Sequence, residues 1–402
     1  MKVLMLTNEF PPYTYGGAGA HVEYLSRELS ALLPVEVRCF GDQHVDKGNL
    51  KVRGFPLPPE PFGAPKPLHS VFGAVQRCWQ MNADGLDADL VHCHTWYSHL
   101  GGILAKLNYG IPLVITTHSL EPLRPWKREQ LAGGYDFSLW VEKTALEMAD
   151  AIIAVSQGTK NDILQLFQVE EKRVHVIHNG IDLDEFNPVD SHAVLTRYGI
   201  PTGRPYVLFV GRITRQKGIM YLVEALSYLD PEFPVVLCAG SPDTPAIAAE
   251  MKEAIARVSA HRDHVYWIPD ILDKPSLIEL YSHAGVFCCP SIYEPFGIIN
   301  LEAMACKIPV VASAVGGIPE VVVEDETGFL VPVDQGESAP FSPKHPDQFS
   351  QDLAERINQL MRDPALRKPM GEAGRRRAEA LFSWRSIATR TKSLYDKVIE
   401  AG

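Results

Sequence analysis

The sequence predicts an α/β protein built of two Rossmann-like, doubly wound domains that face each other across a cleft. Short β-branched runs alternate with longer amphipathic patterns, which is typical of parallel βαβ construction. This alternation occurs twice, once in each half of the chain. The segment 181–206 between the two halves has three prolines and no sustained apolar period. A length of 402 residues also exceeds what one hydrophobic core usually serves.

Each half contains six runs that read as buried strands. In the first half they span 2–6, 35–40, 89–94, 112–117, 151–156 and 174–179. In the second half they span 206–211, 235–240, 264–269, 286–290, 308–313 and 328–332. We therefore expect an N-terminal domain over 1–182, a linker over 183–203 and a C-terminal domain over 204–383. The long helical pattern over 384–402 is expected to fold back onto the first domain.

Composition indicates which kinds of partner the protein binds and in which cellular compartment it works. The formal net charge of −11 argues against a nucleic-acid surface, which needs a basic footprint. No run approaches the roughly 20 apolar residues that cross a bilayer, and the N-terminus lacks a signal-peptide core. The seven cysteines are odd in number and lie mostly in apolar runs. We expect a soluble cytoplasmic protein that is not an integral membrane protein, with a homodimer among its options for assembly.

A glycine-rich loop follows the first predicted strand. Gly16, Gly17 and Gly19 precede a clean amphipathic helix, so backbone N–H groups at its start are available to an anion such as phosphate. The alternative is a flexible strand-to-helix turn. The dinucleotide-binding fingerprint is incomplete, since Val22 stands where a third small residue is required. This counts against a nicotinamide-dependent dehydrogenase.

Two cations follow the first strand of the second half. Arg212 and Lys217 lie in GRITRQKG, at the carboxyl end of that strand, where doubly wound domains bind ligands. A departing diphosphate gains negative charge, and two cations there would stabilise it. The competing interpretation is a solvated surface pair.

Two carboxylates mark the most specific segment, residues 289–313. Glu294 and Glu302 are eight residues apart, about 12 Å if both lie on one helix, and Gly297 stands near the helix start. This spacing suits hydroxyls at the two ends of one ligand, for example a sugar and a ribose. The alternative is one carboxylate at the helix entrance and one exposed carboxylate.

The first half offers further candidates after its strands. His118 follows the strand at 112–117, and Trp96 could stack on a sugar ring or simply pack. The set His92, Cys93, His94 and His99 superficially suggests a metal site, but its spacing matches no known ligand pattern, and we expect no metal. Arg124, with Lys127 and Arg128, is our hypothesis for a phosphate on the acceptor.

Taken together, these motifs resemble a known family. The E-x7-E spacing of Glu294 and Glu302, GRITRQKG at 211–218, NGID at 179–182 and GG-x-G in the first loop resemble retaining glycosyltransferases of the GT-B fold, family GT4. HTWYSHLGG at 94–102 and the segment 117–145 further resemble the short actinobacterial-type glycogen synthases. That group includes ADP-glucose-dependent enzymes that make α-1,4-glucan and others that make α-maltose 1-phosphate from glucose 1-phosphate.

The resemblance implies a role for each matching residue. Arg212 and Lys217 would hold the donor diphosphate, and Glu302 would bind the ribose. Glu294 and His118 would lie against the transferred glucose, and Gly16 and Gly17 would close over donor and acceptor. Catalysis would rest on His118, Glu294, Arg212 and Lys217, and the donor segment would also include Phe296, Gly297 and Ile298. Trp96 and Arg124 are the residues we assign to the acceptor.

The implied activity is a hexosyltransferase of glycogen or maltose 1-phosphate synthesis that retains the anomeric configuration. The acceptor would attack on the face that the diphosphate leaves, and the leaving group would assist removal of the acceptor proton. Neither a metal nor a cofactor is required, because cations and helix-start amides carry the leaving charge. A GT4 enzyme with another donor or acceptor is the nearest alternative, and a non-catalytic two-lobed sugar-binding protein is an alternative from another class.

Overall fold

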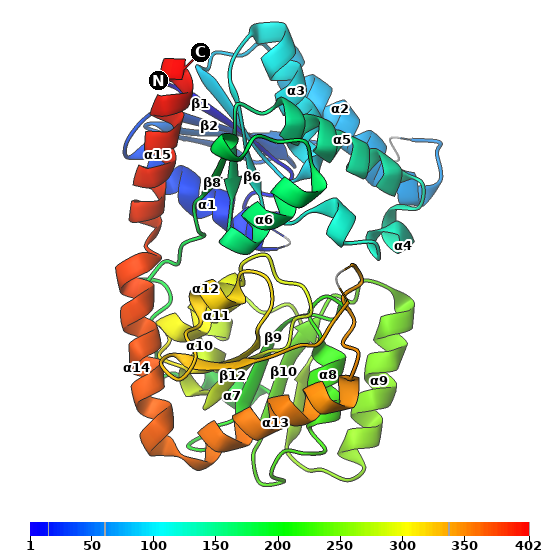
Figure 1. The fold of residues 1–402 in the computed structure, drawn as a ribbon, viewed down its shortest axis with the longest axis vertical. Coiled ribbons are helices and arrows are strands. Elements are labelled where there is room, and N and C mark those ends of the chain that lie inside the picture. The colour runs from blue at the N-terminus through cyan, green and yellow to red at the C-terminus, as the bar shows by residue number, and fades with distance from the viewer. Residues whose placement is uncertain (15, 60–61, 337, 402) are drawn as a thin grey trace. The chain divides into compact units, whose positions relative to one another are not determined.

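The computed structural model describes residues 1–14, 16–59, 62–336 and 338–401, and the chain divides into two compact units (Figure 1). The first unit comprises Met1–Gly180 and Trp384–Gly402, and the second comprises Ile181–Ser383. Each unit contains one sheet with helices packed on it. The predicted pair of Rossmann-like α/β domains is confirmed.

The first unit is built on an eight-stranded sheet in the order β3-β4-β2-β1-β5-β6-β7-β8 within the described residues. All neighbouring pairs are parallel except β3 with β4. The strands are β1 (Val3–Thr7), β2 (Val35–Phe40), β3 (His44–Lys47), β4 (Leu50–Phe55), β5 (Leu90–His94), β6 (Leu113–Thr117), β7 (Ala151–Ala154) and β8 (Val174–Val176). The helices are α1 (Gly17–Ser30), α2 (His69–Ala83), α3 (Trp96–Tyr109), α4 (Lys127–Leu131), α5 (Gly134–Met148), α6 (Gln157–Leu166) and α15 (Trp384–Ala401).

Apolar residues cover both faces of this sheet. Leu4 and Leu6 of β1 point into a core shared with α2, α3 and α5. Val3 and Met5 point to the other face, into a core shared with α1 and α15. Because side chains alternate along a strand, a strand buried on both faces must be continuously apolar. This explains why the strands were readable in the sequence.

The C-terminal helix α15 belongs to the first unit, where it packs against α1. Its first residue, Trp384, stacks on Tyr24 with ring centroids 5.7 Å apart. A Cβ at Gly180 would lie 2.6 Å from the Trp384 ring, so the absence of a side chain there makes room for the indole. Further along α15, the Tyr395 hydroxyl lies 2.6 Å from His92 Nδ1 in β5.

The hairpin of β3 and β4 is absent from the sequence prediction. β3 is a four-residue edge strand whose side chains are mostly exposed, so it has no apolar pattern. Its turn to β4 uses Gly48 with φ +59°.

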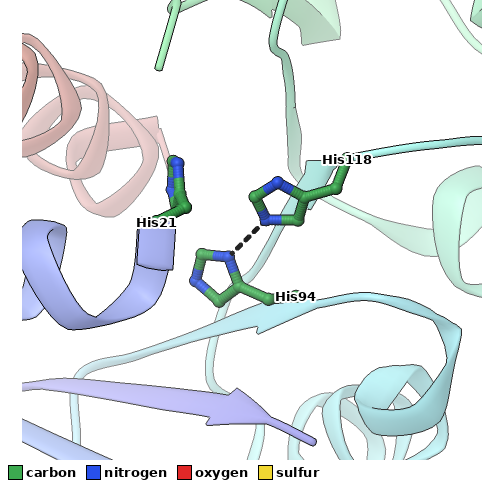
Figure 2. A group of neighbouring side chains, drawn as sticks. All are labelled: His21, His94 and His118. Atoms are coloured by element: carbon green, nitrogen blue, oxygen red, sulfur yellow. Dashed lines mark hydrogen bonds between the residues drawn. The ribbon is translucent and has the colours of Figure 1, made fainter. Parts of the chain in front are cut away.

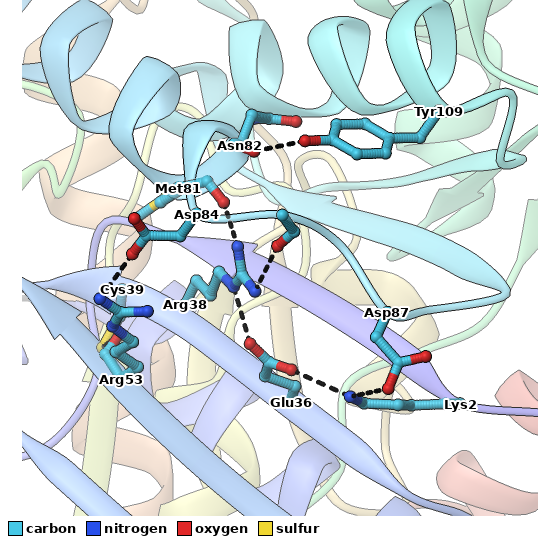
Figure 3. Close-up of polar contacts among 11 residues, drawn as sticks. Lys2, Glu36, Arg38, Cys39, Arg53, Met81, Asn82, Asp84, Asp87 and Tyr109 are labelled. Carbon is cyan, nitrogen blue, oxygen red and sulfur yellow. Dashed lines mark hydrogen bonds and ion pairs between the residues drawn. The ribbon is translucent and has the colours of Figure 1, made fainter.

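Buried charge in the first unit is compensated by a chain of polar contacts (Figure 3). Arg38 of β2 is 5% exposed, and it donates to Glu36 Oε1 at 2.7 Å and to the carbonyl oxygens of Met81 and Gly85. Lys2 Nζ lies 3.2 Å from the other oxygen of Glu36. Burial raises the pKa of Glu36, but the hydrogen bonds and charges of Arg38 and Lys2 outweigh it and lower that pKa overall.

The second unit is built on a six-stranded parallel sheet, in the order β11-β10-β9-β12-β13-β14 among the described residues. The strands are β9 (Val207–Arg212), β10 (Val235–Gly240), β11 (Val265–Ile268), β12 (Val286–Cys289), β13 (Val310–Ser313) and β14 (Gly328–Val331). The helices are α7 (Ala193–Arg197), α8 (Ile219–Ala225), α9 (Pro245–Ser259), α10 (Lys274–His283), α11 (Ile298–Ala305), α12 (Ile318–Val321), α13 (Pro346–Arg362) and α14 (Pro364–Leu381).

The segment expected as a linker, 183–203, lies within the second unit. Glu279 of α10 explains this, because its carboxylate accepts the Ser191 hydroxyl at 2.6 Å and the Leu195 N–H at 3.2 Å. The boundary therefore falls after Gly180 rather than across a free linker.

Candidate active site

The glycine-rich loop of the first unit leads from β1 into α1, with Gly16 as the residue before the helix. The Gly16 N–H donates to Glu9 Oε2 at 2.8 Å. The Glu9 carboxylate thus occupies a backbone N–H that we expected to be available to a phosphate. Gly16 has an extended φ of −161°, and an added Cβ would meet nothing within 4 Å. At Gly19 an added Cβ would lie 2.9 Å from Glu9 Oε2. An added Cβ would therefore push against the Glu9 side chain at Gly19 but meet nothing at Gly16.

Three histidines gather where β1, β5 and β6 end. His94 is the last residue of β5, His118 follows β6, and His21 lies in the first turns of α1. Figure 2 shows the three rings facing one another, with His94 Nδ1 3.1 Å from His118 Nε2. His21 Nδ1 lies 2.7 Å from Asn179 Oδ1. The structure thus places the predicted residue His118 in a cluster of imidazoles.

These imidazoles are uncharged at neutral pH. Burial lowers the pKa of His21 to about 4, despite its hydrogen bond to Asn179. Burial, and then the neighbouring imidazoles, lower the pKa values of His94 and His118 well below the usual value. A neutral His118 can donate or accept one hydrogen bond per ring nitrogen, which suits a sugar hydroxyl.

One sequence interpretation in the first unit needs correction. Trp96 is 5% exposed, stacks on Tyr97 at 4.0 Å and belongs to the core, so it does not present a face to an acceptor. The set His92, Cys93, His94 and His99 is not one cluster. His92 is bound to Thr116 and Tyr395, and Cys93 packs in the core. His94 is grouped instead with His21 and His118.

Arg124 is held by a buried acidic pair. Its Nη1 donates to Ser119 Oγ at 3.0 Å and lies 3.3 Å from Glu121 Oε1, while its Nε is buried without a hydrogen-bond partner. Burial, and then the charge of Glu121, raise the pKa of Glu142 well above its usual value, and the Glu121 N–H donates to Glu142 Oε2 at 2.8 Å. Arg128 pairs separately with Asp136 at 2.6 Å.

In the second unit, Arg212 and Lys217 are each paired with a carboxylate at the carboxyl ends of strands. Arg212 ends β9 and lies 2.7 Å from Asp243, which follows β10. Lys217 Nζ lies 2.7 Å from Glu294 Oε2, which follows β12. Burial would lower the pKa of Lys217, but the Glu294 charge outweighs it and raises that pKa, so Lys217 is an ammonium.

A glycine makes the close approach of Lys217 to β12 feasible. Gly218 has φ +63°, and a Cβ there would collide with the Pro290 carbonyl oxygen. The loop after β9 can therefore run against the end of β12, where Glu294 follows four residues later. Ser291 Oγ donates to the same oxygen of Glu294 at 3.2 Å, so this carboxylate is bound from two sides.

Glu294 and Glu302 do not share a helix, in contrast to the sequence interpretation. α11 begins only at Ile298, after Gly297 with φ +92°, so Glu294 lies in the preceding turn. Glu302 lies within α11 and accepts the Tyr281 hydroxyl at 2.9 Å. Burial raises the pKa of Glu302. The two carboxylates thus have separate partners, Lys217 for one and Tyr281 for the other.

The start of α11 contains one residue that the sequence interpretation missed. Asn300 is 0% exposed, and neither its amide nitrogen nor its amide oxygen has a hydrogen-bond partner. A Cβ at Gly297 would lie 2.6 Å from this amide nitrogen. A polar residue in an otherwise apolar helix start was the available signal. By contrast, Phe296 packs against Phe382 and is 2% exposed, while Ile298 is half-buried.

Family models match most of the chain. Residues 15–185 match Glycosyltransferase Family 4, and residues 193–340 match Glycosyl transferases group 1. The chain is 44% identical over 408 residues to alpha-maltose-1-phosphate synthase of Mycolicibacterium smegmatis, covering 99% of this chain and 100% of that protein. It is 33% identical over 329 residues to D-inositol 3-phosphate glycosyltransferase of Xylanimonas cellulosilytica, covering 78% and 75%.

Among solved structures, sucrose-phosphate synthase from Thermosynechococcus elongatus has a TM-score of 0.81 at 27% identity, with all of both chains covered. Within the described part of the chain, none of the helices combines the length and the apolar character needed to cross a bilayer.

Proposed function

Because the chain belongs to family GT4 of the GT-B glycosyltransferases, we propose that it transfers glucose from ADP-glucose to glucose 1-phosphate and forms α-maltose 1-phosphate. The observation that carries this proposal is the full-length similarity to alpha-maltose-1-phosphate synthase. The names of two further similar proteins also contain a phosphorylated compound, D-inositol 3-phosphate and sucrose-phosphate. An α-1,4-glucan is the competing acceptor.

The second unit supports a role for Arg212 and Lys217 in holding the donor diphosphate. Both cations are already fixed in place by Asp243 and Glu294, so little side-chain entropy is lost when an anion binds. The diphosphate would compete with Glu294 for Lys217, leaving that carboxylate to bind a glucose hydroxyl. Charge that develops on the leaving diphosphate would then be stabilised without a metal ion.

Other donor contacts follow from the same unit. Glu302 uses one oxygen for Tyr281 and would use the other for the ribose. The unpartnered amide of Asn300 and the amides at Gly297 and Ile298 would contact the donor at the start of α11.

The reaction we propose retains the anomeric configuration. The acceptor hydroxyl attacks the anomeric carbon on the face from which ADP leaves, the bond to the diphosphate oxygen breaks, and that oxygen takes the acceptor proton. Neutral His118 hydrogen-bonds a hydroxyl of the transferred glucose. We assign Glu294 the role of a hydroxyl-binding group rather than that of a covalent nucleophile, and Ser291 Oγ still holds its carboxylate once the diphosphate has taken Lys217.

Arg124 is our candidate for the acceptor phosphate in the first unit. Replacing it by Ala should weaken the use of glucose 1-phosphate by about tenfold or more and leave maltodextrin nearly unchanged, because only the former carries a charge-assisted contact. Arg53→Ala is the matched control, since Arg53 pairs with Asp84 at the surface and lies outside this cluster. kcat/KM for both acceptors measures the effect, and equal losses for the two acceptors would rule out this role.

A product assay tests the function as a whole. ADP-glucose, UDP-glucose and GDP-mannose are each offered with glucose 1-phosphate or maltodextrin, with EDTA present. We expect ADP-glucose and glucose 1-phosphate to give the fastest transfer. Transfer only to maltodextrin would assign polymer synthesis instead, and the absence of transfer from ADP-glucose would contradict the proposal.

A further inference from the structure

The cluster of His21, His94 and His118 has the spacing of a metal site. Each ring offers one nitrogen, and these three nitrogens lie within 4.8 Å of one another. Two nitrogens that bind one tetrahedral zinc ion at about 2.0–2.1 Å are roughly 3.4 Å apart. His94 Nδ1 and His118 Nε2, at 3.1 Å, are already close to that separation. Bringing the His21 nitrogen from its present separation, at most 4.8 Å, to this value would complete a three-nitrogen set from the rings in Figure 2.

The hydrogen bonding of His21 leaves one ring nitrogen free to bind a metal ion. Its Nδ1 faces the amide oxygen of Asn179 at 2.7 Å, and an amide oxygen only accepts, so with this assignment the proton lies on Nδ1. Nε2 then keeps its lone pair, and it is buried without a hydrogen-bond partner. A metal-binding histidine usually has this second-shell contact on its other nitrogen. His21 is 2% exposed and His94 is 0% exposed, so both rings are shielded from bulk solvent.

We propose that His21, His94 and His118 bind a transition-metal dication of the Zn²⁺ class, with a fourth coordination position left for water or an anion. Three imidazoles without a carboxylate favour Zn²⁺, Cu²⁺, Ni²⁺ or Co²⁺ over Mg²⁺ or Ca²⁺, which prefer oxygen ligands. The three imidazoles and the Asn179 amide behind His21 are all neutral, so no carboxylate in this group balances the charge of a dication. An anion would balance part of that charge and is therefore the expected fourth ligand.

Occupancy of this site would inhibit transfer. A metal at this site would bind His118, the residue that we assign to the glucose hydroxyl, and would place a dication beside that hydroxyl. This consequence rests on the proposed function, whereas metal binding itself does not.

Cobalt binding tests the site directly. The full chain is titrated with Co²⁺, and the visible bands of tetrahedral cobalt are followed, with Zn²⁺ added afterwards as a competitor. We expect bands in the wild type that Zn²⁺ abolishes. His21→Asn retains a polar group near the position of Nδ1 and removes Nε2, so it should lose the bands, and His118→Asn should lose them too. His99→Leu is the control, since His99 is also buried and unpartnered but lies outside the group, and it should keep them.

Two results would overturn the metal site. One is the absence of tetrahedral bands in the wild type, and the other is bands of equal strength in the wild type and in a folded His21→Asn. Thermal unfolding without metal shows whether each variant is folded, and His118→Asn decides the question if His21→Asn is not.

Inhibition is measured separately, as the Zn²⁺ concentration that halves transfer. We expect this concentration to rise about tenfold or more in His21→Asn, and equal inhibition would overturn the inhibitory role. If the metal-free wild type transfers nothing, the proposed function fails while the cobalt result still stands.

Discussion

The two units place their candidate site residues at the same topological position, but the residues are uncharged imidazoles in the first unit and charged, paired side chains in the second. In each sheet the first strand of the unit lies between strands that the chain reaches in opposite directions, and such a switch point forms a crevice beyond the carboxyl ends of the strands. In the first unit His21 lies in α1, which follows β1, and His94 is the last residue of β5. In the second unit Lys217 and Glu294 follow β9 and β12.

The difference shows two ways of keeping polar groups in dry surroundings. The imidazoles of the first unit give up their charge, because burial lowers their pKa values. The second unit keeps the charge of Lys217 by placing the Glu294 carboxylate beside it. A neutral pocket suits uncharged hydroxyls, and a paired cation suits a diphosphate that replaces its partner. The division of labour in the proposed transfer follows from this contrast.

The largest expected effect tests whether the first unit tolerates buried charge only when that charge is compensated. Arg38→Met should lower the free energy of unfolding by about 3 kcal/mol, because it leaves the half-buried Glu36 beside Lys2 alone. Arg53, its register partner on β4, pairs with Asp84 but is 53% exposed, so Arg53→Met should cost about 0–1 kcal/mol. Urea unfolding measures both variants, and equal losses would contradict the argument from burial.

The next effect tests the paired cation of the second unit. Lys217→Met should reduce kcat/KM for ADP-glucose by roughly 10²–10³-fold, about 3–4 kcal/mol of transition-state stabilisation. Lys307→Met is the control, since Lys307 pairs with Glu372 at the surface, and it should change the rate less than about twofold. A Lys217→Met enzyme with an unchanged rate would remove this residue from the donor site.

The next prediction concerns how the buried histidines of the first unit make stability depend on pH. The pKa of folded His21 is about 4, below the ordinary 6.5, so the unfolded chain binds more protons between these values. The contribution of His21 to the free energy of unfolding is fully present above pH 6.5 and is lost as the pH falls toward 4. The loss for this one residue is roughly 3 kcal/mol. The pKa of His99 is lowered to about 3, so His99→Leu should reduce this loss.

Urea unfolding at pH 7 and pH 5 with EDTA present measures this loss, and limited proteolysis shows which unit opens. Cleavage that begins in the second unit on acidification would contradict the prediction.

The smallest expected effect concerns the loop before α1. Gly16→Ala should leave thermal stability nearly unchanged, because its Cβ meets nothing and its φ is extended. It should lower kcat/KM by about tenfold, roughly 1.4 kcal/mol, if substrate approaches the Gly16 backbone closely. Gly19→Ala should instead lower stability, because its Cβ would lie 2.9 Å from Glu9 Oε2. Full activity in Gly16→Ala would show that substrate does not approach this residue.

The fold was largely readable from the sequence because its strands are buried on both faces. The run at 235–240 coincides with β10, and the run at 35–40 coincides with β2. β3 escaped prediction because an exposed edge strand has no apolar pattern. The position of Glu294 was misjudged for a local reason, since the positive φ of Gly297 delays the start of α11.

The candidate site was predicted only in part. Arg212, Lys217 and Glu294 were recognisable because each comes at the end of a strand or soon after one. Asp243 was not singled out, and neither ion pair could be predicted, because the partners follow different strands. The pairing of His21 with Asn179 spans 158 residues, which no spacing rule anticipates. We interpreted Trp96 as a sugar-stacking residue because the sequence does not show how α3 packs, and the packing of α3 is what buries this ring.

The stereochemistry of one reaction tests the proposed transfer most directly. ADP-glucose and glucose 1-phosphate are mixed with the enzyme in the presence of EDTA, and ¹H and ³¹P NMR follow the first turnovers. The proposal predicts ADP and an α-linked phosphorylated disaccharide in equal amounts. A β-linked product, ADP with free glucose, or no reaction until a metal ion is restored would contradict it.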